Sequence, residues 1–239
     1  MKIGIIAAMA SEREQLARLV KEMRTEQHGL FEYTVGRLGG NTLYIMECGI
    51  GKVNAAVGAS ELMAHMQPDV VVSTGVAGGI DETAGVMEVV AASEVVYHDV
   101  WCGNGNEVGQ IQDMPARFVC DGRLLSVAVS LDASVPVHAG LICTGDKFIT
   151  ERAELDAIKA EFPEGLAVDM ESAACHSSGL PPLPRAFHQF PDYQRHAGSR
   201  CALAAVREFL GNDGRPIFRG STYLLGGFAF FFVLIRKNI

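Results

Sequence analysis

The sequence predicts an α/β protein, a single three-layer domain in which a central mixed sheet is flanked by helices. Short apolar runs that are typical of buried strands alternate along the chain with longer stretches of helical periodicity. The 239 residues suffice for one large domain with a substantial core. Hydrophobic residues make up 49% of the chain and charged residues 20%, which is typical of a globular protein.

The first strand is the apolar run at residues 2–8, as expected for a strand that is buried on both faces. Ser11 and Glu14 then form the pattern of a capping box, which predicts a helix that continues to about Met23. Further strands are expected at residues 34–37, 42–47, 69–74, 87–96, 140–143 and 166–170. Further helices are expected at residues 53–66 and 153–162, and a last one opens at Glu171.

Composition argues against several classes of protein. The net charge of −8 disfavours a nucleic-acid binder, because neutralising phosphates requires clustered Lys and Arg. The six cysteines include no Cys-x-x-Cys pair, so we expect reduced thiols in a cytoplasmic protein. The apolar run at residues 223–235 is shorter than the roughly 20 residues that a membrane-spanning helix needs, so no membrane partner is expected.

Four residues mark a candidate ligand site, because ligands of α/β sheets bind at the carboxyl ends of strands. Glu12, Gly78, Phe148 and Glu171 each lie at or just beyond such an end. Each also has a purely structural interpretation, since carboxylates favour helix N-termini, glycines form turns and phenylalanine is most often a core residue. Considered one by one, these residues leave both interpretations open.

Two other motifs do not support a binding site of their own. The Gly-Ile-Gly-Lys segment at residues 49–52 lacks the spacing of a phosphate-binding loop, because Met46 stands at the first glycine position and Val53 where Ser or Thr is required. A tight strand-to-helix turn explains its glycines better. His98 has no second His or Cys at metal-ligand spacing nearby, so a structural histidine is favoured over a metal ligand.

Six segments, taken together and in order, resemble the 5′-methylthioadenosine/S-adenosylhomocysteine nucleosidases of the purine nucleoside phosphorylase-like superfamily. The segments are residues 2–6 with Met9 and Glu12, 49–53, 73–79, 97–99, 145–149 and 167–172. The resemblance extends from residue 1 to about residue 174. It implies a nucleoside phosphorylase-like fold, a small-molecule nucleoside substrate, hydrolysis of its N-glycosidic bond with release of adenine, no metal or organic cofactor, and a homodimer.

The resemblance also implies a role for each matching residue. Glu12 would be the general base that activates water for attack on the anomeric carbon of the ribose. Glu171 would hold the ribose hydroxyls, and Met170 would pack against the sugar and the sulfur. Phe148 would stack on adenine, and the backbone of Ile149 would hydrogen-bond its edge. The remaining substrate-binding positions are Met9, Ala77 and Gly78.

The resemblance ends before the family's third catalytic element. After the helix that Glu171 opens, the family pattern requires a strand and a Ser-Asp pair, whose Asp is the general acid that protonates the adenine leaving group. No Ser-Asp pair follows Glu171 in this sequence, and Asp192 and Asp213 stand in unrelated contexts. The general-acid Asp is therefore absent from this chain.

A shift of reading frame near the Ala174 codon accounts for this loss. When the degenerate codons of residues 184–198 are read from the second base, the allowed translations include a family-like segment with the missing Ser-Asp pair. Two neighbouring stretches give family-like sequence in the same frame. Residues 175–239 also hold eight basic and three acidic residues, a net charge of +5 in a chain of −8. We therefore predict an incomplete nucleosidase domain at residues 1–174 and an out-of-family, frame-shifted tail at residues 175–239.

Two alternatives to an active nucleosidase remain open. The first is a related purine nucleosidase or phosphorylase. Hydrolysis is favoured over phosphorolysis because the turn after the first strand offers the carboxylate of Glu12, which would repel phosphate, instead of a cradle for an anion. The second alternative is a catalytically disabled remnant that binds a nucleoside without turning it over.

Overall fold

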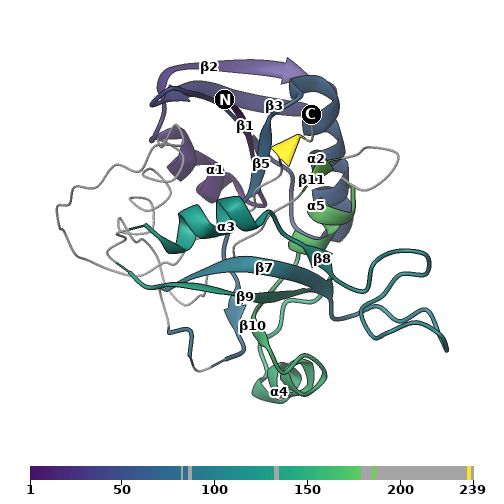
Figure 1. Ribbon diagram of the computed structural model, residues 1–239. Helices are drawn as coiled ribbons and strands as arrows, with labels where there is room; N and C mark the ends of the chain where they lie inside the picture. The colour runs from purple at the N-terminus through teal and green to yellow at the C-terminus, as the bar shows by residue number, and fades with distance from the viewer. Residues whose placement is uncertain (82, 86–87, 132–134, 179–184, 187–235, 238–239) are drawn as a thin grey trace.

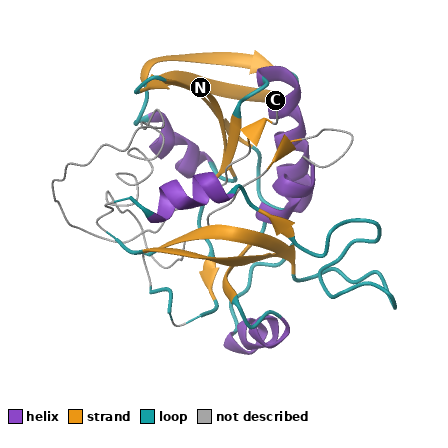
Figure 2. Ribbon diagram, in the orientation of Figure 1, coloured by secondary structure: helices purple, strands orange, loops and turns teal. Residues whose placement is uncertain are grey.

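The computed structural model describes residues 1–81, 83–85, 88–131, 135–178, 185–186 and 236–237. Within them, helices flank two mixed five-stranded sheets, which confirms the predicted α/β class (Figure 1, Figure 2). Three expectations concern residues outside this part of the chain: the start of the strand expected at 87–96, the apolar run 223–235, and most of the tail predicted at 175–239.

The first sheet is built around the strand at the N-terminus. Its members are β1 (Lys2–Ala7), β2 (Lys21–His28), β3 (Phe31–Leu38), β4 (Asn41–Glu47) and β5 (Val70–Ser73), in the order β2-β3-β4-β1-β5. β1 runs parallel to β4 and β5, whereas β3 is antiparallel to both of its neighbours. Every residue of β1 after Lys2 is buried, which is why this strand reads as a continuous apolar run.

The second sheet contains the strands of the C-terminal half. Its members are β6 (Gly78–Gly79), β7 (Val89–Tyr97), β8 (Phe118–Val119), β9 (Val137–Thr144) and β10 (Gly165–Asp169), in the order β6-β10-β9-β7-β8. β9 is parallel to β7 and β10, and the two short edge strands are antiparallel. Alternate residues of β9 face opposite sides, since Ile142 packs in the main core while Leu141 and Cys143 pack in a second, smaller cluster.

Five helices cover these sheets in the part of the chain that is described. They are α1 (Ala10–Ala17), α2 (Lys52–Met66), α3 (Gly122–Val129), α4 (Arg152–Glu161) and α5 (Ser172–Ser178). α2 and α5 lie side by side, and α4 packs on the second sheet through Ile158 (Figure 1). A short antiparallel pair joins β11 (Arg185–Ala186) to β12 (Arg236–Lys237). None of the helices described here is long and apolar enough to cross a membrane.

The first helix differs from the prediction at both ends. Met9, and not Ser11, is its N-cap, which places Glu12 at the third helical position in place of Glu14. The helix ends at Ala17 because β2 begins at Lys21, where the sequence predicts helix as far as Met23. β2 is an edge strand with six exposed residues among its eight, so it lacks the apolar alternation that identifies a half-buried strand.

The sequence analysis also missed α3 and the two-residue strands β6 and β8. Such short strands are too brief to show a periodic pattern. α3 did carry a signal, because the side chain of Asp121 caps it by accepting the backbone N–H groups of Arg123 and Leu124, at 2.9 and 3.2 Å.

Candidate active site

A cavity of about 190 Å³ opens where the carboxyl ends of strands from both sheets meet. Its wall is formed by the segments that follow β1, β4, β5, β9 and β10. All eight residues that the sequence analysis singled out lie on this wall: Met9, Glu12, Ala77, Gly78, Phe148, Ile149, Met170 and Glu171. Segments far apart in the sequence thus meet at one site, and the role of each residue stays a prediction.

Glu12 is a buried carboxyl group on the β1 side of the cavity. Its Oε2 accepts the backbone N–H groups of Ala8 and Met9, each at 3.1 Å. Its Oε1 has no hydrogen-bond partner of good geometry among the described residues. Burial raises the pKa of Glu12 to about 7; the charge of Glu171 adds to this, and nearby backbone N–H groups oppose it. Near neutral pH this carboxyl group can therefore both accept and release a proton.

Gly75 gives Glu12 the space it occupies. A Cβ atom at Gly75 would lie 3.0 Å from Oε1 of Glu12 and 3.4 Å from its carboxyl carbon. Contacts as short as 3.0 Å to a Cβ atom are rare in proteins, so a side chain here would push the carboxyl group from its position. Steric contact with Glu12 therefore favours a glycine at position 75, in addition to any role of this glycine in a turn.

Glu171 lines the cavity between the end of β10 and the start of α5. Its Oε1 accepts the backbone N–H of Gly51 at 2.8 Å, and its Oε2 accepts the N–H of Met170 at 3.3 Å. Burial raises its pKa. Gly51 has a φ of +95°, which explains the glycine in this turn, as the sequence analysis expected. The carboxyl group of Glu171 is thereby fixed to a turn 120 residues earlier in the chain.

Asp169 is a third carboxyl group on the cavity wall, to which the sequence analysis gave no role. Its Oδ1 accepts the hydroxyl of Thr144 at 2.5 Å, and its Oδ2 accepts both the backbone N–H and the hydroxyl of Ser172. Full burial and the nearby charge of Glu171 raise its pKa well above the usual range. Thr144 also accepts the N–H of Ala173 at 2.9 Å. Together these bonds anchor the first turn of α5, directly beside Glu171.

The segment after β9 forms a more open wall. Phe148 lines the cavity with 71% of its surface exposed, so one face of its ring is accessible to a planar ligand. Thr74, which directly follows β5, also lines the cavity, and its buried hydroxyl has no hydrogen-bond partner among the described residues. The sequence analysis missed Thr74 as a lining residue, although it stands within a segment that resembles the family.

The sequence carries no general-acid Asp at the expected place, and the two aspartates considered there, Asp192 and Asp213, lie outside the described residues. The described chain continues α5 to Ser178, four residues beyond the boundary predicted at Ala174. Cys175 and His176 are buried in this last turn. Structurally, the ordered helix thus extends slightly further than the predicted nucleosidase domain.

Comparisons with known proteins show which proteins this chain resembles. A family model described as the phosphorylase superfamily matches residues 2–177. The 5′-methylthioadenosine/S-adenosylhomocysteine nucleosidase of Chromohalobacter salexigens is 43% identical over 188 residues, which cover 75% of this chain and 80% of the relative.

Solved structures of such nucleosidases are similar as well. The enzyme from Neisseria meningitidis in complex with methylthio-immucillin-A superposes with a TM-score of 0.70 at 34% identity, covering 74% of this chain and 79% of that one. The enzyme from Colwellia psychrerythraea in complex with adenine gives 0.71 at 37% identity, covering 75% and 76%.

Proposed function

Because the chain belongs to the 5′-methylthioadenosine/S-adenosylhomocysteine nucleosidases of the phosphorylase superfamily, we propose that its cavity binds these nucleosides. Members of this family hydrolyse the N-glycosidic bond of both substrates. The observation that carries the proposal is that two carboxyl groups, the buried Glu12 and the half-buried Glu171, line one cavity that also presents the exposed ring of Phe148. Adenine would stack on Phe148, and the ribose hydroxyls would donate hydrogen bonds to Glu171.

In the proposed reaction Glu12 is the general base. As water attacks the anomeric carbon, a C–O bond forms and one proton of the water passes to the carboxylate of Glu12. The C–N bond breaks with its electron pair going to adenine, which takes a proton from solvent water in a chain without the acid. Its pKa of about 7 suits this step, because the ionised form is available near neutral pH and its basicity exceeds that of an ordinary carboxylate. Oε1, which has no hydrogen-bond partner of good geometry among the described residues, is the oxygen with capacity to accept the proton.

Adenine leaves more readily when it is protonated, and the chain lacks the Asp that the family pattern provides for this step. We keep the predicted division into a nucleosidase domain at residues 1–174 and a frame-shifted tail at residues 175–239. Two observations support it: no Ser-Asp pair follows Glu171, and the superfamily match ends at residue 177. Without the acid, this chain should release adenine more slowly than a family member that has the Asp, by roughly 10²-fold or more.

The same observation favours a second candidate function. A chain that keeps Glu12, Glu171 and the stacking ring but lacks the acid fits a nucleoside-binding remnant that has lost catalysis. The two candidates share the site and differ in turnover. Binding alone therefore cannot separate them, whereas the release of adenine can.

The proposal includes a homodimer. Val53 and Val57 lie four residues apart near the start of α2 and are 74 and 41% exposed, and Ile50, in the turn before this helix, is 53% exposed. Phe148 exposes its ring on the wall of the neighbouring cavity. A second copy of the chain would cover such an apolar surface. A cytoplasmic location remains a prediction from the cysteine pattern.

The proposed function is tested by calorimetric titration of the purified chain with methylthioadenosine, together with adenine release with and without inorganic phosphate. We expect saturable binding, and adenine release that does not depend on phosphate. Phosphate-dependent release with formation of a sugar phosphate would instead identify a phosphorylase. Absence of binding to methylthioadenosine, S-adenosylhomocysteine and adenine alike would contradict the proposed site.

A further inference from the structure

Two parts of the segments that resemble the family have no role in the function proposed above. They are the Tyr-His-Asp segment that ends at Asp99, and Lys52, the first residue of α2. Neither Lys52 nor Asp99 is part of the cavity wall. Both nevertheless contact Asp146, which lies between the end of β9 and the wall residues Phe148 and Ile149.

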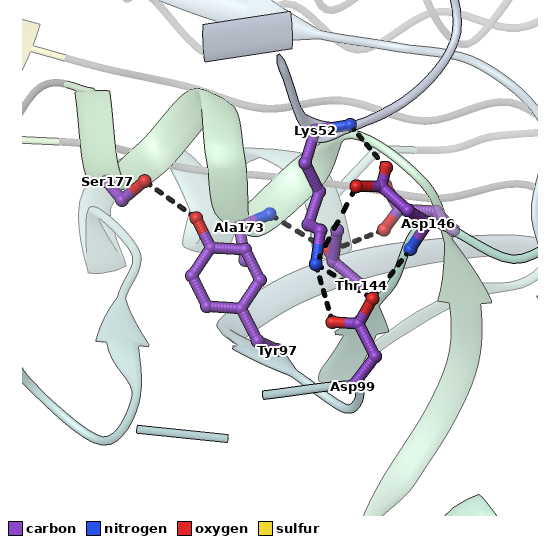
Figure 3. A network of polar contacts seen from close by, with 8 residues as sticks. Lys52, Tyr97, Asp99, Thr144, Asp146, Ala173 and Ser177 are labelled. Atoms are coloured by element: carbon purple, nitrogen blue, oxygen red, sulfur yellow. Dashed lines mark hydrogen bonds and ion pairs between the residues drawn. The ribbon is translucent and has the colours of Figure 1, made fainter. Parts of the chain in front are cut away.

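The three residues form a closed triangle of polar contacts (Figure 3). The ammonium of Lys52 donates to both carboxylate oxygens of Asp99 at 2.7 Å and lies 3.8 Å from Oδ2 of Asp146. The backbone N–H of Lys52 donates to Oδ1 of Asp146 at 2.7 Å. The backbone N–H of Asp146 donates to Oδ2 of Asp99 at 2.8 Å. Each residue is therefore held by the other two.

Two of the three side chains in the triangle are partly shielded from water, whereas that of Asp146 is 46% exposed. The side chains of Lys52 and Asp99 are 19 and 28% exposed. The ammonium also lies 5.3 Å from the centre of the ring of Tyr97, whose hydroxyl is 2.7 Å from Oγ of Ser177 in α5. Burial alone would raise the pKa of Asp99, but the bonds from Lys52 and from the N–H of Asp146 outweigh it and lower the pKa. Asp99 is thus a stable anion at this position.

The chain is also packed tightly where the triangle meets the loop after β9. A Cβ atom at Gly145 would lie 2.3 Å from Nε2 of His98 and 3.0 Å from the carboxyl carbon of Asp99. No side chain fits in this space, so the Tyr-His-Asp segment packs directly against the backbone of the loop at Gly145. His98 accordingly has a packing role, which agrees with a structural histidine.

The triangle connects the two halves of the cavity. On one side, Gly51 directly precedes Lys52 and donates its N–H to Glu171. On the other side, Asp146 precedes Phe148 by two residues. Glu171, which is proposed to bind the ribose, and Phe148, which is proposed to stack on adenine, are therefore connected through Lys52, Asp99 and Asp146. None of these three residues lines the cavity.

We propose that Asp99 is a positioning residue: acting through Lys52 and the backbone of Asp146, it fixes the loop that carries Phe148 relative to Glu171. The inference rests on the proposed function. As a consequence of this positioning, the subsites for adenine and for ribose are held at the separation that one nucleoside requires. A ligand that joins two subsites gains affinity only when their geometry allows both to be occupied at once.

The test compares Asp99→Asn with Asp156→Asn in the full chain. Asp156 pairs with Arg152 on exposed α4, so its substitution makes the same chemical change away from the triangle. Amide hydrogen exchange is measured first, because it needs no ligand. We expect Asp99→Asn to increase exchange at Lys52 and Asp146 while the amides of β1 keep their protection, and Asp156→Asn to change neither. Unchanged exchange at Lys52 and Asp146 would overturn the proposal.

Calorimetric titration then uses two ligands, adenine and methylthioadenosine. We expect Asp99→Asn to weaken methylthioadenosine by about tenfold and adenine by less than about twofold. Lys52→Met should give a similar loss, and the double variant should lose little more than either single variant, because the two side chains act as a pair. Equal weakening of both ligands would indicate a purely structural role and would overturn the proposal.

The two arms keep this inference separate from the proposed function. If the unaltered chain binds neither ligand, the proposed function fails, and the exchange measurement still decides whether Asp99 couples the two loops. If the chain binds both ligands but Asp99→Asn leaves their affinities and the exchange unchanged, the proposed function stands and the positioning role is wrong.

Discussion

The two proposed catalytic carboxyl groups are held in opposite ways. Glu12 accepts its hydrogen bonds from Ala8 and Met9, four and three residues away in the same turn. Glu171 takes one from Gly51, 120 residues earlier, at the edge of the triangle that also includes Asp99. The comparison indicates that the hydrogen bonds of Glu12 come from its own turn, whereas one of the two hydrogen bonds of Glu171 forms only once distant segments have assembled.

The largest expected difference concerns turnover. Glu12→Gln should lower adenine release by about 10²–10⁴-fold, because the amide cannot accept a proton from water, while methylthioadenosine still binds. Glu171→Gln should mainly weaken binding, since its proposed partners are ribose hydroxyls. Rates of adenine release and calorimetric affinities of both variants check this. If both variants lose binding and turnover to the same extent, the proposed division of roles is wrong.

A smaller effect is expected on stability, and it depends on pH. The pKa of Glu12 is 4.5 in an ordinary environment and about 7 in the folded chain. Between these values the unfolded chain has lost a proton that the folded chain keeps, so the free energy of unfolding falls as the pH rises through this window, by about 3 kcal/mol in total. Above about pH 7, the free energy of unfolding stays at this lower value.

Glu12→Gln removes this penalty, and its amide oxygen can still accept the N–H groups of Ala8 and Met9. The gain in unfolding free energy over the unaltered chain should therefore be about 3 kcal/mol larger at roughly pH 8 than at roughly pH 4. Denaturant unfolding at both values measures it. A gain that does not change with pH would show that Glu12 titrates normally in the folded chain.

The smallest expected effect concerns the turn that binds Glu171. Gly51→Ala forces a non-glycine residue to a φ of +95° and places a Cβ atom 3.0 Å from Oδ1 of Asp146, which should cost about 1–2 kcal/mol and weaken nucleoside binding. The matched control is Gly122→Ala, at the start of α3, where a Cβ atom meets nothing within 4 Å. That change should stabilise slightly. Equal denaturation midpoints for the two variants would contradict this account of the turn.

The same contrast explains how much of the molecule could be predicted from its sequence. The apolar run of β1, the turn at Gly51 and eight residues of the cavity wall are encoded in short segments and were recognised there, whereas the lining residue Thr74 was missed. The start of β2, as far as Met23, was taken for helix and the rest of the strand was not recognised, because an exposed edge strand lacks apolar alternation. The contacts of Lys52 with Asp99 and Asp146 span 47 and 94 residues, so no local pattern contains them.

Asp169 shows the same limit inside a recognised motif. Its place beside Glu171 was visible in the sequence, yet its function as the anchor of α5 depends on Thr144, 25 residues away on the neighbouring strand. One conclusion about the site follows from the sequence without the structure: no Ser-Asp pair follows Glu171.

The central claim is that this chain retains a nucleoside site but lacks the acid that completes its chemistry. It is tested most directly by measuring adenine release from saturating methylthioadenosine, with the 239-residue chain beside a chain whose reading frame is restored after the Ala174 codon. We predict release that is slower by roughly 10²-fold or more in the unaltered chain. Equal rates in the two chains would contradict the claim and would mean that the tail supplies its own acid or that none is needed.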